Sequence, residues 1–295
     1  MRVTFWGTRG SIAAPGPETA RYGGNTACVE VRADRHILIL DAGTGIRPLG
    51  LALAREFSGR PLTVHLFITH THWDHIQGFP FFVPVFARDT TIRVYGAPGQ
   101  GRSLEKVLRG QMESDYFPVG LGDLAATIDV QEFRGTDIEI GDVTVAATYL
   151  NHPGMNLAYR VSHAGRRLVY ATDHEPYAQT LDRLAGRGDE GRVFGERLDA
   201  GVVAFAREAD LLIADAQYTD EEYTRRIGWG HSPLSATVAL ATAARVKALA
   251  LYHHDPLHAD DVVAEMERLA CAMIAAGGAA IRCFAAADGL SLTLD

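Results

Sequence analysis

Potential metal ligands crowd together directly after one apolar segment of the chain. Residues 62–68 are rich in β-branched and aromatic side chains and are predicted to form a buried strand. The following residues bring His70, His72, Asp74 and His75 close together in the sequence. We therefore expect these side chains in a loop at the end of a strand, where α/β folds hold their functional residues.

The spacing of these side chains favours metal binding over a merely polar loop. Neutral imidazole is a common ligand of zinc, and carboxylate suits harder ions. Alternation along an extended segment places His70 and His72 on the same side, where both can reach one ion. Asp74 and His75 come after the turn and point towards a second ion. A structural zinc site is disfavoured, because such sites are usually rich in cysteine and no cysteine lies nearby.

The pattern His-X-His-X-Asp-His after a buried strand resembles the signature of the metallo-β-lactamase-fold hydrolases. Helical and strand patterns alternate along the 295 residues, which independently favours an α/β class. The resemblance implies a four-layer αβ/βα sandwich in a single domain over residues 1–295, with insertions near 100–125 and 175–200. It also implies a metal-dependent hydrolase with two divalent ions and a bridging hydroxide. Zinc is the first expectation, and manganese or iron would also accept histidine and aspartate.

Further ligands are implied by the resemblance at the ends of later predicted strands. His152 follows the strand 143–149, Asp173 follows 167–170, and His253 follows 248–252. His254 is the alternative to His253, because a one-residue slip turns a side chain to the other face. The implied ligand sets are His70, His72 and His152 for the first metal, Asp74, His75 and His253 for the second, and Asp173 as the bridge.

Several other residues near these positions have less certain roles. The resemblance makes Asp41 a buried group that helps to order the metal loop, and a turn aspartate is the alternative. His174 is excluded as a ligand, because consecutive residues point apart. The role of His258 stays open. The remaining histidines inside strand or turn patterns are expected to be structural, namely His36, His65 and His163.

A glycine-flanked histidine precedes the predicted helix 234–245. The segment Gly-His-Ser around His231 resembles the phosphodiesterase branch of the family, which includes tRNase Z and class II cyclic-nucleotide phosphodiesterases. In that branch the histidine assists the scissile phosphate and the leaving oxygen. Many members have threonine where this chain has Pro233, and Ser232 is expected to cap the helix. The expected catalytic residues are His231 and Asp74, which would orient the hydroxide. An exposed loop histidine is the alternative reading of His231.

The expected reaction is hydrolysis of a phosphodiester, with a cyclic nucleotide or another small phosphodiester as substrate. A net charge of −8 argues against a broad nucleic-acid-binding surface. Two divalent ions held by neutral histidines and two aspartates would nevertheless leave a local charge of about +2, which suits an anion. The alternatives are an RNA 3′-end processing nuclease, a thioesterase, lactonase or β-lactamase on the same scaffold, and a non-catalytic metal-binding sensor.

Cysteine use and the chain start suggest a compartment. Cys28, Cys271 and Cys283 have no motif spacing and are expected to be buried free thiols of a reducing environment. The chain begins with a strand pattern, and neither a signal peptide nor a membrane-spanning segment is recognised. We therefore expect a cytoplasmic protein without a membrane partner, and a homodimer stays open. Residues 175–200, charged and glycine-rich, are expected to form a surface insertion or mobile loop.

Overall fold

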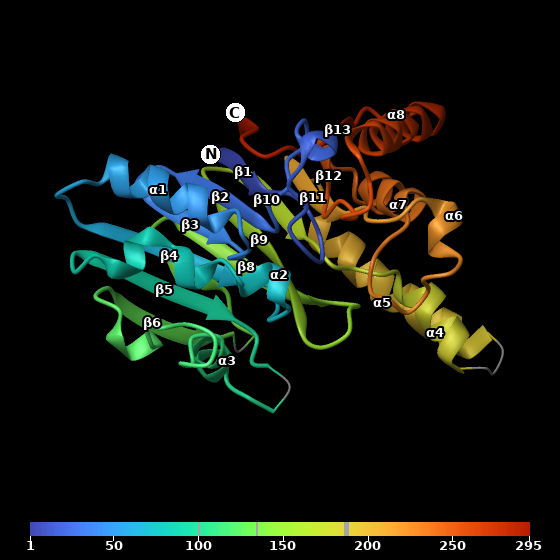
Figure 1. Ribbon diagram of the computed structural model, residues 1–295. Helices are drawn as coiled ribbons and strands as arrows, with labels where there is room; N and C mark the ends of the chain where they lie inside the picture. The colour runs from blue at the N-terminus through green and yellow to red at the C-terminus, as the bar shows by residue number, and fades with distance from the viewer. Residues whose placement is uncertain (100, 134, 186–188) are drawn as a thin grey trace. The chain divides into compact units, whose positions relative to one another are not determined.

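Apolar segments within the described part of the chain form two seven-stranded sheets. The computed structural model describes residues 1–99, 101–133, 135–185 and 189–295 (Figure 1). Contacts divide the chain into two compact units, the first comprising Met1–Thr136 with Ala287–Asp295 and the second Asp137–Ala286. Each unit contains one of the sheets, so each has its own core and its own set of strand ends.

The sheet of the first unit has the strand order β14-β1-β2-β3-β4-β5-β6. Its first pairs are antiparallel, whereas β3, β4, β5 and β6 run parallel to one another. Parallel strands end at the same edge of a sheet, so the loops after β3 and β4 emerge together. The strands are β1 (Arg2–Gly7), β2 (Cys28–Ala33), β3 (His36–Leu40), β4 (Leu62–Ile68), β5 (Thr90–Gly96), β6 (Thr127–Glu132) and β14 (Ser291–Thr293).

Helix α1 (Ile46–Glu56) supplies much of the cover of this sheet. Its buried Ile46, Leu49 and Leu53 belong to one core cluster with side chains of β3, β4 and β5. The spacing of these three residues is that of one helical face. The remaining helices of the unit are short: α2 (Trp73–Ile76), α3 (Leu104–Gly110), and 3-10 turns at Pro17–Thr19, Phe79–Phe81, Val83–Phe86 and Leu121–Asp123.

The sheet of the second unit has the order β13-β12-β11-β10-β9-β8-β7. Strands β10, β11, β12 and β13 are parallel, and β8, β9 and β10 form successive antiparallel pairs. Two antiparallel steps make β8 parallel to β10, so β8, β10, β11 and β12 all end at one edge. The strands are β7 (Ile138–Ile140), β8 (Val143–Leu150), β9 (Asn156–His163), β10 (Arg166–Ala171), β11 (Leu211–Asp215), β12 (Ala248–Tyr252) and β13 (Arg282–Ala285).

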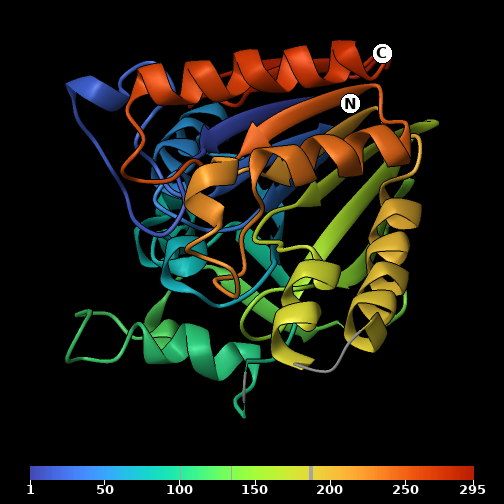
Figure 2. The same cartoon turned by 90° about the vertical axis from the view of Figure 1, so that its right-hand side faces the viewer.

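Helices of the second unit pack on its sheet through small and branched side chains. Figure 2 shows α8, α7 and α5 in red, orange and yellow beside one another. Their buried residues share a core cluster with Val169, Leu212 and Leu249 of the sheet. The helices are α4 (Tyr177–Ala185), α5 (Asp189–Ala206), α6 (Asp220–Tyr223), α7 (Leu234–Ala244) and α8 (Asp260–Ala276).

Two local expectations from the sequence are wrong, namely the cap of α7 and the burial of all three cysteines. Pro233 rather than Ser232 occupies the N-cap position of α7, which has no side-chain cap, and the Ser232 hydroxyl donates to the carbonyl oxygen of His174. Cys28 is buried as expected, whereas Cys271 on α8 is exposed and Cys283 is only partly buried. Residues 175–200, expected to form a surface insertion or mobile loop, contain α4 and the first part of α5 where they are described. Positions 186–188 and 100 of the two predicted insertions lie outside the described residues.

Among the described residues, no helix combines the length and the apolar composition needed to cross a membrane.

Candidate metal-binding residues

In the first unit, Asp41 organises the loop that follows β4. It comes directly after β3, has a positive φ of 64° and is fully buried. Its Oδ1 accepts hydrogen bonds from the backbone N–H (2.8 Å) and the hydroxyl (3.0 Å) of Thr69, and its Oδ2 lies 2.8 Å from His75 Nδ1. Asp41 therefore has the ordering role that the resemblance implied, rather than that of an exposed turn residue.

The hydrogen bonds around Thr69 determine which nitrogen of His70 carries its proton. A carboxylate only accepts hydrogen bonds, so the Thr69 hydroxyl donates to Asp41. Its oxygen can then accept from His70 Nδ1, which lies 3.1 Å away. His75 Nδ1 donates to Asp41 in the same way. Both histidines thus present an Nε2 lone pair, the form of imidazole that binds a metal.

The predicted ligands of this unit lie together. The ring centroid of His70 is 4.4 Å from that of His72 and 4.3 Å from that of His75. Asp74 Oδ2 lies 3.2 Å from His75 Nε2 and also accepts the backbone N–H of Ser11 at 2.7 Å. The loop after β1 thereby fixes the direction of the Asp74 carboxylate. His72 is the one exposed member of the group.

In the second unit, Asp173 lies between His152, which follows β8, and His253, which follows β12. It follows β10, and its two oxygens face different partners: Oδ1 is 3.2 Å from His253 Nε2, and Oδ2 is 3.7 Å from His152 Nε2. Asp173 and His253 both have a positive φ, 54° and 61° respectively. This conformation is uncommon for residues other than glycine and turns the chain sharply after the strand. A carboxylate with one oxygen towards each imidazole has the arrangement expected of a bridging ligand.

Each of these two histidines is also oriented by a hydrogen bond from its Nδ1. His152 Nδ1 donates to the carbonyl oxygen of Gly230 at 2.8 Å, and His253 Nδ1 donates to Gln217 Oε1 at 2.8 Å. The Gln217 amide nitrogen in turn lies 3.5 Å from a carboxylate oxygen of Asp255, which fixes the amide orientation. Both histidines therefore also direct an unprotonated Nε2 towards Asp173.

His231 lies beside the same histidines and is held by a carboxylate. Its Nδ1 is 2.7 Å from Asp215 Oδ2, at the end of β11. Its ring stacks on that of His253 with centroids 5.0 Å apart, and it meets the ring of His152 edge-on at 5.1 Å. His231 is buried. The alternative of an exposed loop histidine is therefore wrong, and the ring lies next to Asp173.

A buried glutamate fixes the loop that carries His231. Glu175 is 1% exposed, and its Oε1 accepts hydrogen bonds from the Tyr223 hydroxyl and the backbone N–H of Gly228, both at 2.7 Å. Its Oε2 accepts the N–H of Gly230 at 2.8 Å. These donors compensate for the burial of the carboxylate, and together they make the turn before His231 rigid.

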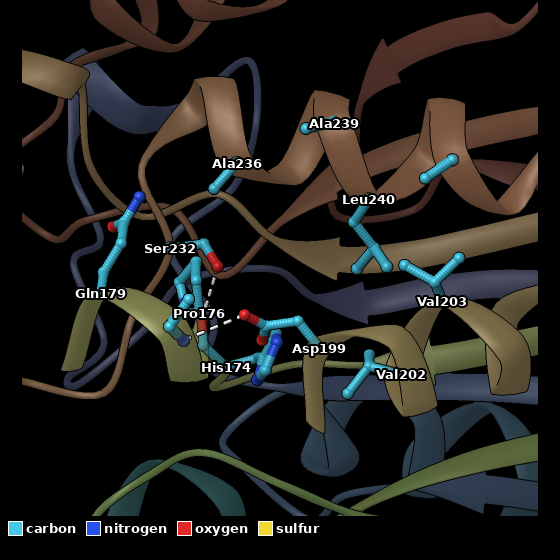
Figure 3. A pocket seen from close by; sticks show the side chains of 12 residues that line it. His174, Pro176, Gln179, Asp199, Val202, Val203, Ser232, Ala236, Ala239 and Leu240 are labelled. Carbon is cyan, nitrogen blue, oxygen red and sulfur yellow. Dashed lines mark hydrogen bonds between the residues drawn. The ribbon is translucent and has the colours of Figure 1, made fainter. Parts of the chain in front are cut away.

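His174, adjacent to Asp173, faces a separate cavity of the second unit. Its Nδ1 accepts the backbone N–H of Asn151 at 3.3 Å, and burial lowers its pKa to about 4. Figure 3 shows its ring beside Asp199 at the polar end of a cavity of about 330 Å³, whose other end is lined by aliphatic side chains of α5 and α7. The structure thus directs His174 away from the Asp173 cluster, as expected.

The remaining uncertain histidines take structural roles. His254 Nε2 lies 2.9 Å from the carbonyl oxygen of Ala286, so of the two adjacent histidines it is His253 that faces Asp173. His258 Nε2 lies 2.9 Å from Glu222, which forms the capping box of α6. His65 contacts the Tyr95 hydroxyl at 3.2 Å and His163 contacts Asp142 at 3.0 Å. None of these interactions involves Asp173.

The donor atoms of both units fit divalent metal ions. Two ligands bound tetrahedrally at about 2 Å from one ion lie about 3.3 Å apart. The nitrogen–oxygen separations of 3.2 Å in the Asp74–His75 and Asp173–His253 pairs are close to this value. Four histidines donate a hydrogen bond from Nδ1 and so present an unprotonated Nε2 that can bind a metal: His70, His75, His152 and His253.

Comparison with known proteins agrees with this donor set. Residues 35–254 match the family described as the Beta-lactamase superfamily domain. The chain belongs to this family. Its members hold the α/β metallo-β-lactamase fold, and this protein is accordingly a metal-dependent hydrolase of that fold.

Relatives and solved structures extend the similarity over most of the chain. The Ribonuclease Z of Haloferax volcanii is 29% identical, with 88% of this chain and 86% of that protein covered. The Ribonuclease Z of Myxococcus xanthus is 26% identical, with 88% and 89% covered. The fold is similar to that of YhfI from Bacillus subtilis (TM-score 0.66, 16% identity, 99% of both chains) and the short form of human tRNase Z (0.64, 20%, 100% of both).

Three residues near the predicted ligands were not anticipated from the sequence. Asp215 orients His231, Gln217 orients His253, and Glu175 holds the loop before His231. Asp215 did carry a signal: like Asp41 and Asp173, it is an aspartate at the end of a buried strand. Glu175 and Gln217 carried none, because their partners are distant in the sequence.

Proposed function

We propose that this protein is a phosphodiesterase that hydrolyses a small phosphodiester such as a cyclic nucleotide. The observation that carries the proposal is the buried Asp215–His231 pair beside His152 and His253. An imidazole held by a carboxylate suits proton donation to a departing oxygen. A thioester releases a thiolate, which needs little such help, so the pair favours an oxygen leaving group over a thioesterase reaction.

The assignment of metal ligands follows the prediction from the sequence. His70, His72 and His152 would hold the first ion, Asp74, His75 and His253 the second, and Asp173 would serve both. Divalent ions, with zinc as first choice, supply a nucleophile from water at neutral pH and neutralise charge on the phosphoryl group. The support for this set is the uniform Nε2 presentation of its buried histidines and the 3.2 Å ligand separations.

The residues of the chain divide the remaining chemistry between them. His231, protonated at both nitrogens, donates its Nε2 proton to the leaving oxygen. Its Nδ1 keeps its proton and donates a hydrogen bond to Asp215. The negative Asp215 stabilises the positive form of the ring before the transfer. Asp74, whose Oδ2 accepts the Ser11 N–H, would orient the attacking water. Bond formation at phosphorus and proton delivery to the leaving oxygen are thereby assigned to different side chains.

RNA is the second candidate substrate. It is favoured by the relatives named Ribonuclease Z, whose similarity covers most of this chain. The net charge of −8 favours the small substrate instead, because binding to a nucleic-acid backbone depends on positive surface charge. The cytoplasmic location and the homodimer stay predictions.

The experiment that tests the proposal measures metal content and turnover on one sample. The zinc-loaded protein is offered bis-p-nitrophenyl phosphate, a thioester, a lactone and a β-lactam, and then cyclic nucleotides and RNA with a 3′ extension. About two metal equivalents per chain with turnover of the diester alone would support the proposal. Preferred turnover of the thioester, lactone or β-lactam would replace it, and binding of a nucleotide without turnover would favour a sensor.

A further inference from the structure

A rigid loop of the second unit presents an exposed tryptophan two residues before His231. Trp229 is 62% exposed, although a large aromatic side chain normally gains from burial. It lies between Gly228 and Gly230, whose φ values of 93° and 88° are accessible mainly to glycine. The sequence Gly-Trp-Gly therefore builds a tight turn with the indole at its tip.

The backbone around Trp229 is fixed on all sides. Glu175 accepts the N–H groups of Gly228 and Gly230, and the N–H of Trp229 itself donates to the carbonyl oxygen of Arg226 at 3.0 Å. Burying the Glu175 carboxylate is costly unless it is fully hydrogen-bonded, and most of its partners belong to this turn. The buried Glu175 carboxylate thus stabilises the turn that carries the exposed Trp229 ring.

The distance from Trp229 to the proposed reaction is short. Two residues of chain span at most about 7 Å, so an indole at position 229 can reach a group bound at His231. His231 is itself fixed through Asp215. Within the described part of the chain the Trp229 indole makes no ring contact and no hydrogen bond, and it is largely exposed, so it is accessible to a ligand.

We propose that Trp229 forms a subsite that stacks on the nucleobase of the substrate. The inference rests on the proposed phosphodiesterase function and specifies its substrate as a nucleotide or the end of a nucleic acid. A flat, rigid, exposed aromatic ring is the side chain on which bases stack, and stacking tolerates any base because every base has a π-face. Trp229 contributes to substrate binding and takes no part in proton transfer.

Two esters with the same leaving group separate base binding from the chemical step. Thymidine 5′-(p-nitrophenyl phosphate) carries a base, and methyl p-nitrophenyl phosphate does not. In Trp229→Ala we expect kcat/KM for the thymidine ester to fall about tenfold or more, the effect of losing one base stack. The methyl ester should be hydrolysed at the rate of the unmodified protein. Trp229→Phe keeps a ring and should retain most of the thymidine ester activity.

A matched control and a binding measurement complete the test. Phe194→Ala removes a similarly exposed aromatic side chain from α5 of the same unit and should change neither ester. Thymidine 5′-monophosphate should quench tryptophan fluorescence in the unmodified protein and not in Trp229→Phe, whereas methyl phosphate should quench neither. Equal losses on both esters, or no loss on either, would overturn the subsite.

The fluorescence measurement also distinguishes failure of the phosphodiesterase function from failure of the Trp229 subsite. If neither ester is hydrolysed but the nucleotide still quenches Trp229, the phosphodiesterase function fails and the base subsite stands. If both esters are hydrolysed and Trp229 neither quenches nor affects their ratio, the function stands and the subsite fails. In that case the exposed ring is better explained as a contact for a macromolecular partner.

Discussion

Asp215 Oδ2 lies 2.7 Å from His231 Nδ1, and the carboxylate is itself held in place. Its Oδ1 accepts the backbone N–H of Gln217 at 3.0 Å and that of Ser232 at 3.3 Å. The carboxylate therefore cannot rotate freely, and His231 Nε2 has one direction in which to act. This geometry makes a prediction that depends on the leaving group.

His231→Ala should slow hydrolysis of a diester with an alkyl alcohol leaving group by about 10²–10⁴-fold, the usual value of a general acid. The same change should cost much less with p-nitrophenolate, which departs without a proton. Asp215→Asn, a change in a positioning residue, should show the same dependence on the leaving group with a smaller loss. The measurement is kcat for both substrates with metal content determined in parallel. Equal losses on both substrates would contradict the assigned role.

Gly230→Ala should displace His152. A Cβ at position 230 would lie 2.3 Å from His152 Nδ1, and the φ of 88° already disfavours alanine. Gly228→Ala is the matched control, because its φ of 93° is similar while nothing lies within 4 Å of an added Cβ. We expect bound metal to fall clearly in Gly230→Ala and to remain in Gly228→Ala, as measured by metal analysis after dialysis. Similar metal content in the two variants would show that the contact with Gly230 does not position His152.

Asp41→Asn should weaken metal binding without contacting the metal. The substitution disturbs the acceptors of Thr69 and His75 Nδ1, and loss of such a supporting partner typically costs 10–100-fold in metal affinity. Asp34→Asn is the control, since Asp34 is an exposed turn aspartate that also has a positive φ, 51°. Competition with a chelator measures the affinity. An unchanged zinc affinity in Asp41→Asn would contradict the proposed role of this residue.

The parts of the fold that follow from local pattern were predictable from the sequence. The strand 62–68 has the bounds of β4, and His152, Asp173 and His253 follow strands whose apolar patterns are clear. These strands run in the same direction and end at one edge of the sheet, so residues that directly follow them lie near one another. The sequence favours His253 as the first choice, with His254 as the alternative. In the structure His253 Nε2 lies 3.2 Å from Asp173, and His254 Nε2 lies 2.9 Å from the carbonyl oxygen of Ala286.

Features that depend on distant partners could not be read from the sequence. Helix α4 begins at Tyr177 because Asp199, on α5, accepts the N–H groups of Tyr177 at 2.8 Å and Ala178 at 3.0 Å. No residue close to Tyr177 in the sequence indicates this cap, so the sequence predicts no helix start there. Glu175 likewise acts on Gly228 and Gly230, more than fifty positions away. Such tertiary hydrogen bonds override weak local preference.

Asp288 should make the first unit less stable as pH rises. Burial raises the pKa of Asp288 from 3.8 to about 6, even though its oxygens accept hydrogen bonds from Asn25 and Thr8. The folded state then holds the proton more tightly than the unfolded state between these two values. Over that range the unfolded chain loses the proton first, so the free energy of unfolding falls with increasing pH, by at most about 3 kcal/mol.

The test compares the unmodified protein with Asp288→Asn by denaturant titration at about pH 4 and about pH 7, with a chelator present so that metal binding does not contribute. Asparagine makes some of these hydrogen bonds poorly, and this lowers the stability of the variant by the same amount at both pH values. The loss therefore cancels when the stability differences at the two pH values are compared. Relative to the variant, the unmodified protein should lose stability between the two pH values. The partly buried Asp288 carboxyl group ionises in this range, whereas the asparagine side chain has no group that ionises. A stability difference independent of pH would show that Asp288 ionises as readily in the folded protein as in the unfolded chain.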